Sequence, residues 1–240
     1  MKIAVVVCTY NRPALLGHLV RSFELQDYPD REMVILDDAG QYRSQSGPRW
    51  QLVSIARRFR SLGEKRNALA ALASPGAEAF AVWDDDDLYL PWALSASVAA
   101  LERADWSRPS LVLHPSADWT LRQHETGGLY HGGWAYRRGA FDAAGGYPPL
   151  SGPEDQGLAK KFEQLGVTQA DPIALGFRPF YVYPWAEMAR SWGHLSGLGG
   201  RAWEKIGRYV IEPAELVPSD PPGMDLLHPW ILDGIHKRPF

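Results

Sequence analysis

Short apolar runs alternate with helical patterns along the first half of the chain. Residues 3–7 (IAVVV) form a continuous β-branched run, which is typical of strands buried on both faces. The segments at 32–38 (EMVILDD) and 79–83 (AFAVW) predict two further strands. Helical patterns separate and follow these runs. The order strand, helix, strand, helix, strand, helix predicts a parallel, doubly wound α/β sheet.

Three helices are expected in this half. The first follows Asn11 and Pro13, which we interpret as a cap and an early helical proline, and its apolar positions from Leu15 to Phe23 form one stripe. The second covers 64–73 (EKRNALAALA), and the third begins at Pro91.

The second half is richer in glycine, proline and tryptophan. Strand pieces are expected at 110–121 and 179–184, and a strand, a short helix and a turn at 132–150. A helix is expected over 152–166, with acidic residues in its first turn that favour the N-terminal dipole. Beyond Gly193 the composition predicts a mobile tail.

Bulk composition limits the class of protein. The 240 residues are 45% hydrophobic and 22% charged, with a net charge of −3, as in ordinary soluble globular proteins. The single cysteine, Cys8, excludes an internal disulfide, indicates a reducing compartment and is interpreted as an inert core residue. No apolar run is long enough for a signal peptide or a membrane span. A cytoplasmic protein is expected.

Four consecutive aspartates, 84–87, follow the predicted strand at 79–83. Like charges side by side repel, and ligands of open α/β sheets bind at the carboxyl ends of strands. Carboxylates are ligands of hard cations such as Mg²⁺. In an extended segment alternate residues share a side, so Asp84 and Asp86 would share a ligand while Asp85 and Asp87 face elsewhere. The alternative is a solvated acidic turn before the next helix.

Five motifs, in order and at suitable spacing over roughly residues 2–185, resemble family 2 glycosyltransferases of the GT-A fold. They are VVVCTYNRPALLGHLVRSF, MVILDDAG, LGEKRNALAALA, AVWDDDDLYLP and GGWAYRRGAFDAAGGYPPLSGPEDQGLAKKF. The resemblance implies a Rossmann-like, mostly parallel sheet flanked by helices, with a mixed acceptor-side region. It also implies a nucleotide-sugar donor, most often a UDP-sugar, a divalent Mn²⁺ or Mg²⁺, and inverting transfer of a hexosyl-type sugar.

The resemblance implies a role for each matched position. One domain over 1–240 is expected, with a nucleotide-sugar-binding half (1–105), an acceptor and catalytic half (106–192) and a flexible C-terminal segment (193–240). Asp155 matches the catalytic base. Asp86 and Asp84 match the ends of the DxD motif, for the metal and for the ribose side of the donor. The other donor-binding positions are Thr9, Tyr10, Arg12, Asp38, Lys65, Arg66, Asn67 and Asp85.

Several assignments remain alternatives. His194 is a candidate further metal ligand, and Trp134, Glu154 and Trp192 are candidates for the acceptor side, with Trp119 and Trp185 as weaker ones. Glu154 and Asp155 could serve only as first-turn helix residues, and Lys65 and Arg66 only as a solvated helix start. The stretch at 197–202 (GLGGRA) follows no strand and is not a dinucleotide fingerprint; it would suit a loop over the donor phosphates, with Arg201 as a helper.

Other functions and the acceptor stay open at this point. A nucleotidyltransferase, a non-catalytic nucleotide-sugar-binding module and a metal-dependent hydrolase are alternatives. The QxxRW signature of processive members is absent, which favours non-processive transfer. The acceptor could be a carbohydrate, a small molecule or a modified nucleobase, and the basic patches at 57–60 and 137–138 leave a phosphate-bearing acceptor possible.

Overall fold

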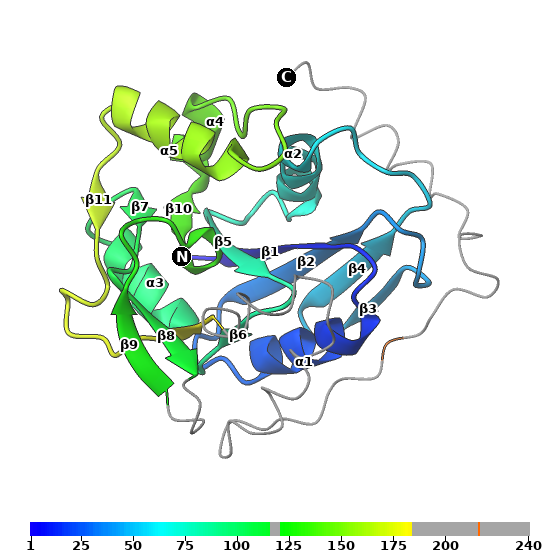
Figure 1. Ribbon diagram of the computed structural model, residues 1–240, viewed down its shortest axis with the longest axis horizontal. Coiled ribbons are helices and arrows are strands. Elements are labelled where there is room, and N and C mark those ends of the chain that lie inside the picture. The colour runs from blue at the N-terminus through cyan, green and yellow to red at the C-terminus, as the bar shows by residue number, and fades with distance from the viewer. Residues whose placement is uncertain (116–120, 184–215, 217–240) are drawn as a thin grey trace.

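A computed structural model describes residues 1–115, 121–183 and 216. Its main sheet has eight strands in the order β11-β7-β10-β5-β1-β2-β4-β3 (Figure 1). The parallel centre consists of β1 (Ile3–Thr9), β2 (Arg31–Asp37), β4 (Trp50–Ser54) and β5 (Ala79–Asp84). The remaining strands are β3 (Gln45–Gly47), β7 (Trp106–Ser107), β10 (Ala135–Arg137) and β11 (Gln169–Ala170). The mostly parallel α/β sheet expected from the sequence is confirmed.

A second, smaller sheet lies beside the first and has the order β6-β12-β8-β9. Its strands are β6 (Leu88–Tyr89), β8 (Leu111–Pro115), β9 (Leu121–Glu125) and β12 (Tyr181–Val182). Because β6 begins soon after the aspartate run, this sheet forms directly beside the carboxyl end of β5.

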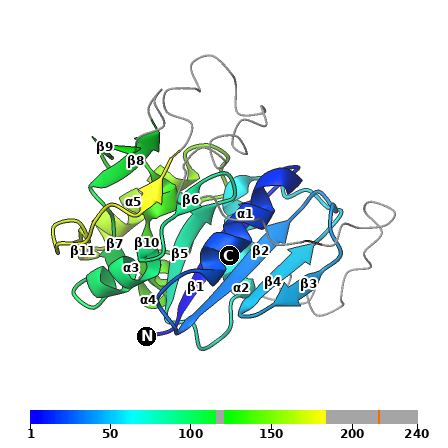
Figure 2. The same ribbon diagram turned by 90° about the horizontal axis from the view of Figure 1, so that it is seen from below.

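Helices cover both faces of the main sheet, because the side chains of β1 alternate between two cores. Ile3, Val5 and Val7 pack on the face covered by α1 (Pro13–Glu24) and α3 (Ala93–Leu101). Ala4 and Val6 pack on the face covered by α2 (Leu62–Leu72), α4 (Arg138–Ala143) and α5 (Glu154–Gln164). Figure 2 shows α1 lying across β1 and β2 on one face of the main sheet. The predicted helices are confirmed, with α5 followed by Gly166 at φ 67°.

Two local predictions are wrong. The first is the simple alternation of strands and helices, since the β3–β4 hairpin lies between β2 and α2. The second concerns Asn11, which does not cap α1. Arg12 occupies the cap position, and Asn11 adopts φ 55°, where its side-chain oxygen accepts a hydrogen bond from Gln41 Nε2 at 3.1 Å. Asparagine tolerates this left-handed conformation better than most residues.

The loop before α5 packs tightly on α2, and this contact requires a glycine. A Cβ on Gly63 would lie 1.8 Å from the carbonyl oxygen of Pro148. Gly63→Ala is therefore expected to lower the free energy of unfolding by about 1–3 kcal/mol, because the clash exceeds the higher helix propensity of alanine. Chemical denaturation would measure the change. Gly76→Ala, where a Cβ meets nothing within 4 Å, is the control and should change stability little; equal effects at both positions would contradict the clash.

No helix in the described part of the chain is long and apolar enough to cross a lipid bilayer. The expected division into an N-terminal donor half and a C-terminal acceptor half stays a prediction.

Candidate active site

The carboxyl ends of three parallel strands bring the polar residues together. Thr9 at the end of β1 pairs in register with Asp37 of β2, and Cys8 pairs with Asp84 of β5. Asp38 and the rest of the aspartate run follow directly. Asp37 itself holds the loop: it accepts hydrogen bonds from the backbone N–H groups of Ala39 and Gln41.

Each of the four aspartates has a different environment. Asp84 accepts a hydrogen bond from Arg66 Nη2 at 3.2 Å, and Asp85 accepts from Thr9 Oγ1 at 2.7 Å. Arg12 Nη1 lies 2.8 Å from an oxygen of Asp85 and 2.7 Å from one of Asp86.

Asp87 is buried and accepts a hydrogen bond from Tyr181 Oη at 2.6 Å. The expected extended alternation is wrong, because the chain turns after Asp84 and the Asp87 N–H approaches the Asp84 carbonyl. It is Asp85 and Asp86 that share a cation, Arg12. The alternative of a solvated acidic turn is also wrong, since Asp85, Asp86 and Asp87 are buried.

The charge at this site is poorly compensated by the protein. Burial, and then repulsion from Asp85, raise the pKa of Asp86 from 3.8 to about 7 although Arg12 opposes this. Burial and the neighbouring carboxylates also raise the pKa of Asp87, whose Oδ1 has no hydrogen-bond partner among the described residues. Such buried like charges are costly unless a cation joins them.

The residues present fit a hard divalent cation that takes most of its ligands from elsewhere. The donor atoms are carboxylate oxygens, which Mg²⁺ and Mn²⁺ prefer. The negative charge of the four aspartates exceeds the positive charge of the neighbouring guanidinium groups of Arg12 and Arg66. No group of three or more metal-ligating side chains occurs in the part of the chain that the structure describes. A cation held by one or two carboxylates and by substrate phosphate needs no such group.

A cavity of about 520 Å³ opens at the carboxyl ends of β1 and β2, and the residues that follow these two strands supply four of those in its walls. It is lined by Tyr10, Asn11, Asp38, Ala39, Gln41, Ala56 and Arg58. Tyr10 is 46% exposed, and the guanidinium carbon of Arg58 lies 3.4 Å from the centre of its ring. A flat aromatic surface next to a buried carboxylate suits a planar heterocycle with N–H groups at its edge.

Lys65 and Arg66 are buried at the start of α2 and tie the site together, so the alternative of a solvated helix start is wrong. Lys65 Nζ donates to the Thr9 carbonyl at 2.6 Å and also to Asp38. Arg66 joins Asp84 to Glu154, whose Oε1 lies 3.3 Å from Arg66 Nε. These two cations therefore connect the ends of β1, β2 and β5 with the beginning of α5.

Neighbouring residues at the start of α5 differ in exposure. Glu154 is 3% exposed, and its second oxygen accepts from the Gly152 N–H at 2.9 Å. The prediction that Glu154 faces an acceptor is wrong, because both its oxygens are engaged inside the protein. Asp155 is only partly buried, and one of its oxygens accepts from the Gln156 N–H.

Two other predicted site residues hold the structure together. Trp134 is 1% exposed and packs against Trp106, with ring centres 5.0 Å apart, so the prediction that its ring stacks on an acceptor is wrong. The Asn67 amide donates to the carbonyl and accepts from the N–H of Tyr147, which anchors the loop before α5. Its contact with a donor stays a prediction. Cys8 is partly buried, and burial raises the pKa of its thiol.

Some candidates lie outside the described residues: Trp119, Trp185, Trp192, His194 and Arg201. Sequence reasoning missed Arg58 as part of the cavity and Tyr181 as the partner of Asp87. Recognition of the strand at 50–54 would have placed Arg58 near a strand end. The alternating tyrosines of the 181–183 segment were the signal that could have identified Tyr181.

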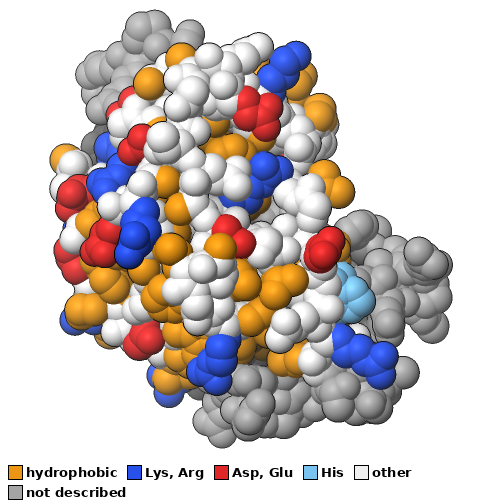
Figure 3. Space-filling view, turned by 90° about the vertical axis from the view of Figure 1, so that its left-hand side faces the viewer, with side chains coloured by type: hydrophobic (Ala, Val, Ile, Leu, Met, Phe, Trp, Pro, Cys, Tyr) orange, Lys and Arg blue, Asp and Glu red, His pale blue; other side chains and the backbone are white. Residues whose placement is uncertain are grey.

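On the face shown in Figure 3, basic and acidic side chains are interspersed, and no broad basic area marks that face as a nucleic-acid surface.

The sequence matches the family model described as glycosyl transferase family 2 over residues 4–127. The chain belongs to this family. No curated protein matches it.

Solved structures of glycosyltransferases share the fold. S. aureus TarS 1-349 in complex with UDP-GlcNAc is 17% identical with a TM-score of 0.60, covering 89% of this chain and 67% of that one. Mannosyltransferase PcManGT from Pyrobaculum calidifontis, in complex with GDP-Man and Mn²⁺, is 18% identical with a TM-score of 0.57. The match covers 98% of this chain and 72% of that one. In another TarS 1-349 structure the match spans only 60% of that chain. These similarities establish a GT-A-type α/β fold.

Proposed function

We propose that the protein is a non-processive, inverting and metal-dependent glycosyltransferase, which moves a hexosyl-type sugar from a nucleoside-diphosphate sugar to an acceptor hydroxyl. The observation that carries this proposal is the convergence, at one edge of the sheet, of a cavity lined by Tyr10, a largely buried aspartate run and a helix that carries Asp155 in its first turn. Membership of the family and the UDP- and GDP-sugar complexes of its structural neighbours support it.

The cavity is proposed to bind the nucleobase. Tyr10 offers the ring on which the base stacks, and Asp38 accepts a hydrogen bond from its edge. Lys65 holds Asp38 and the Thr9 carbonyl in place, so the carboxylate is fixed before the donor arrives. A UDP-sugar is the proposed donor.

Asp84 and Asp86 are proposed to hold the divalent cation and the ribose side of the donor. A bound Mg²⁺ or Mn²⁺ would supply electrostatic stabilisation of the negative charge that develops on the departing diphosphate. Arg12 offsets part of the charge of Asp85 and Asp86, and Arg66 fixes the direction of the Asp84 carboxylate.

Asp155 is proposed to accept the proton of the acceptor hydroxyl. The acceptor oxygen then forms a bond to the anomeric carbon as the bond from that carbon to the diphosphate oxygen breaks, with inversion. The proton ends on the Asp155 carboxylate, and the electron pair leaves with the nucleoside diphosphate. One carboxylate is sufficient, because this displacement has no covalent intermediate between sugar and enzyme.

A thermal-shift screen of UDP, GDP, dTDP and CDP, each with and without Mn²⁺, tests the proposal. A ligand that binds only the folded protein raises its melting temperature by mass action. One of the nucleotides is expected to stabilise the wild type only when the metal is present, and Asp86→Ala should lose that response. Absence of any shift with every nucleotide and metal would overturn the proposal.

Removal of the Tyr10 ring should weaken donor binding without unfolding the protein, because the ring is 46% exposed. Tyr10→Ala is expected to raise the Kd of the stabilising nucleotide about 10- to 100-fold, which corresponds to a stacking contribution of about 1–3 kcal/mol. Isothermal titration calorimetry would measure it. Tyr10→Phe keeps the ring and should bind nearly as the wild type does; an equal loss in both variants would assign the effect to the hydroxyl.

A further inference from the structure

Aromatic side chains of the smaller sheet begin at the aspartate run. Tyr89 Oη accepts a hydrogen bond from the Asp84 N–H at 2.9 Å, and Tyr181 Oη donates to Asp87. The two rings stack with centres 5.4 Å apart. Gly132 lies close to this group, since a Cβ there would approach Asp84 Oδ2 and both hydroxyls at 2.9 Å. The smaller sheet is thus coupled directly to the proposed donor site.

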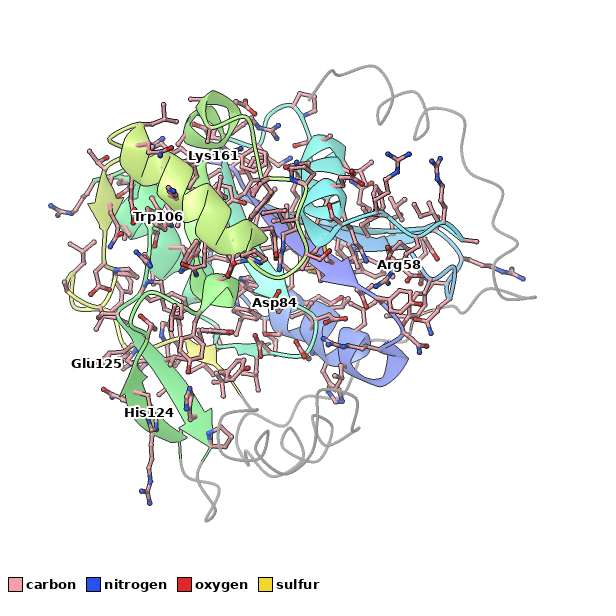
Figure 4. All side chains as sticks on the ribbon, turned by 45° about the horizontal axis from the view of Figure 1, so that its top comes forward. Arg58, Asp84, Trp106, His124, Glu125 and Lys161 are labelled. Carbon is pink, nitrogen blue, oxygen red and sulfur yellow. The ribbon has the colours of Figure 1, made fainter. Side chains whose placement is uncertain are left out.

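Further rings lead away from Tyr181 toward the surface. Tyr130 lies 6.3 Å from Tyr181 and 5.1 Å from Tyr183, centre to centre, and His114 lies 5.7 Å from Tyr130. His124 stacks on His114 at 4.4 Å with the planes 19° apart. We name the four outer residues, Tyr130, Tyr183, His114 and His124, the aromatic shelf. Figure 4 shows His124 on the smaller sheet, to one side of Asp84.

The shelf is not a closed core, because three of its four rings reach the surface at least in part and His114 is the buried exception. Tyr181 is 1% exposed, Tyr130 and Tyr183 are partly buried, and His124 is exposed. Rings that served packing alone would be covered, as Tyr181 is. The shelf therefore offers an aromatic surface that starts within the field of the aspartates.

His114 supplies a second, independent observation. It is 6% exposed, yet its Nε2 has no hydrogen-bond partner among the described residues. Burial, and then the neighbouring His124, lower the pKa of His114 to about 4, so its ring is neutral near pH 7. A neutral imidazole nitrogen can donate or accept a hydrogen bond, and leaving it unpaired is costly.

Taken with the proposed transferase function, on which it rests, this arrangement allows a more specific assignment. We propose that the aromatic shelf binds a saccharide acceptor, with the apolar C–H face of a sugar ring on Tyr130 and Tyr183 and a sugar hydroxyl on His114 Nε2. The negative face of an aromatic ring attracts such C–H groups, and a few polar atoms at the rim fix orientation. Arg122, opposite His114 in the β8–β9 register, is a further donor at that rim.

The location of the shelf agrees with an acceptor site. Burial, and then Asp87 and Asp86, raise the pKa of Tyr183 to about 12, so this phenol lies within the field of the aspartate run. A sugar on Tyr183 would lie beside the donor diphosphate without entering the nucleobase cavity, which is lined by other residues.

Saturation-transfer-difference NMR tests the proposal, with the full chain, Mg²⁺ and UDP present. The probes are lactose, maltose, cellobiose, xylobiose and N,N′-diacetylchitobiose. At least one is expected to receive saturation on the C–H protons of one ring face. Tyr130→Ala and Tyr183→Ala should each weaken that saccharide about tenfold or more, whereas Tyr130→Phe should not. His114→Phe should weaken it too while raising the melting temperature, because the unpaired nitrogen is gone.

UDP binding is followed in every variant by thermal shift. It separates the proposed transferase function from the proposed saccharide site on the aromatic shelf. Saccharide binding that survives both alanine variants would overturn the shelf as its site. UDP binding without any saccharide binding would overturn the shelf proposal and leave the transferase proposal intact. Failure of the wild type to bind any nucleoside diphosphate would overturn both. If an alanine variant fails to fold, Tyr130→Phe and His114→Phe still decide, because the first must bind the saccharide as the wild type does and the second must bind it more weakly.

Discussion

Asp86→Asn is expected to abolish sugar transfer and, in the absence of metal, to make the protein more stable. The carboxylate of Asp86 is buried beside Asp85, and the one cation that pairs with it among the described residues, Arg12, is shared with Asp85. Loss of a group that stabilises developing charge should reduce turnover at least about 10²- to 10³-fold. The same substitution removes a buried charge whose environment disfavours it.

The pKa of Asp86 gives the sign and the size of the stability effect. Its folded-state pKa lies near 7 instead of 3.8, so the folded protein holds that proton more strongly than the unfolded chain. The associated stability is complete below pH 3.8 and is lost as the pH rises through 7. A shift of this size corresponds to about 4 kcal/mol. Because asparagine is itself a polar group to bury, we expect a gain of about 1–3 kcal/mol, or several degrees in Tm.

Differential scanning calorimetry at pH 5 and pH 8 with a chelator would measure the effect. The advantage of the variant should be larger at pH 8, where the wild-type carboxylate is charged. Asp142→Asn, at an exposed position of α4, is the matched control and should leave both stability and transfer unchanged. A lower Tm for Asp86→Asn at pH 8 would show that the pair with Arg12 outweighs the repulsion. Transfer that persisted would remove Asp86 from the metal site.

The central sheet was predictable because its strands are continuous apolar runs. β1 and β5 are buried on both faces, and parallel pairing with helices on each side is the arrangement that buries such runs. β4 was missed, since its sequence WQLVS contains polar positions and follows a turn at Arg49 with φ 65°. Its strand character comes from pairing with β2, which is tertiary information.

Burial separated residues that the sequence presents as equivalent. Asp37 and Asp38 are adjacent, yet the first holds its own loop and the second lines the cavity. The Trp134 side chain is of a type that often stacks on sugars, but Trp106 of β7 packs against its ring. The tyrosines that reach the aspartates come from β6 and β12, which lie far apart in the chain. Motif spacing locates such a site, and packing decides which side chain of each motif enters it.

Glu154 and Asp155 differ for the same reason, and the difference has a mechanistic consequence. Consecutive helical residues point about 100° apart, so one can face the protein while the next does not. Glu154 faces Arg66 and, through it, Asp84. We infer that this buried connection holds the start of α5 at the aspartate run, which leaves Asp155 as the carboxylate available for proton transfer.

Asp155→Asn is therefore expected to reduce turnover about 10²- to 10⁴-fold, the usual contribution of a general base, with little change in stability or in nucleotide affinity. Release of nucleoside diphosphate from the donor, with water or an acceptor as nucleophile, would measure turnover, and calorimetry would measure affinity. The steric match is close, because asparagine cannot accept the proton but keeps the hydrogen bond to the Gln156 N–H.

The neighbouring Glu154→Gln is the control that distinguishes chemistry from structure. It removes one partner of a buried ion pair and leaves Arg66 with Asp84 as its one ion-pair partner in the described part of the chain, so we expect a loss of about 1–3 kcal/mol in stability. The folded fraction of this variant should turn over within about tenfold of the wild type, because the proposed base is intact. If Asp155→Asn instead lost stability and kept its turnover while Glu154→Gln lost the chemical step, the two roles would be exchanged. The buried carboxylate would then be the base, and Arg66 would have to release it during the reaction.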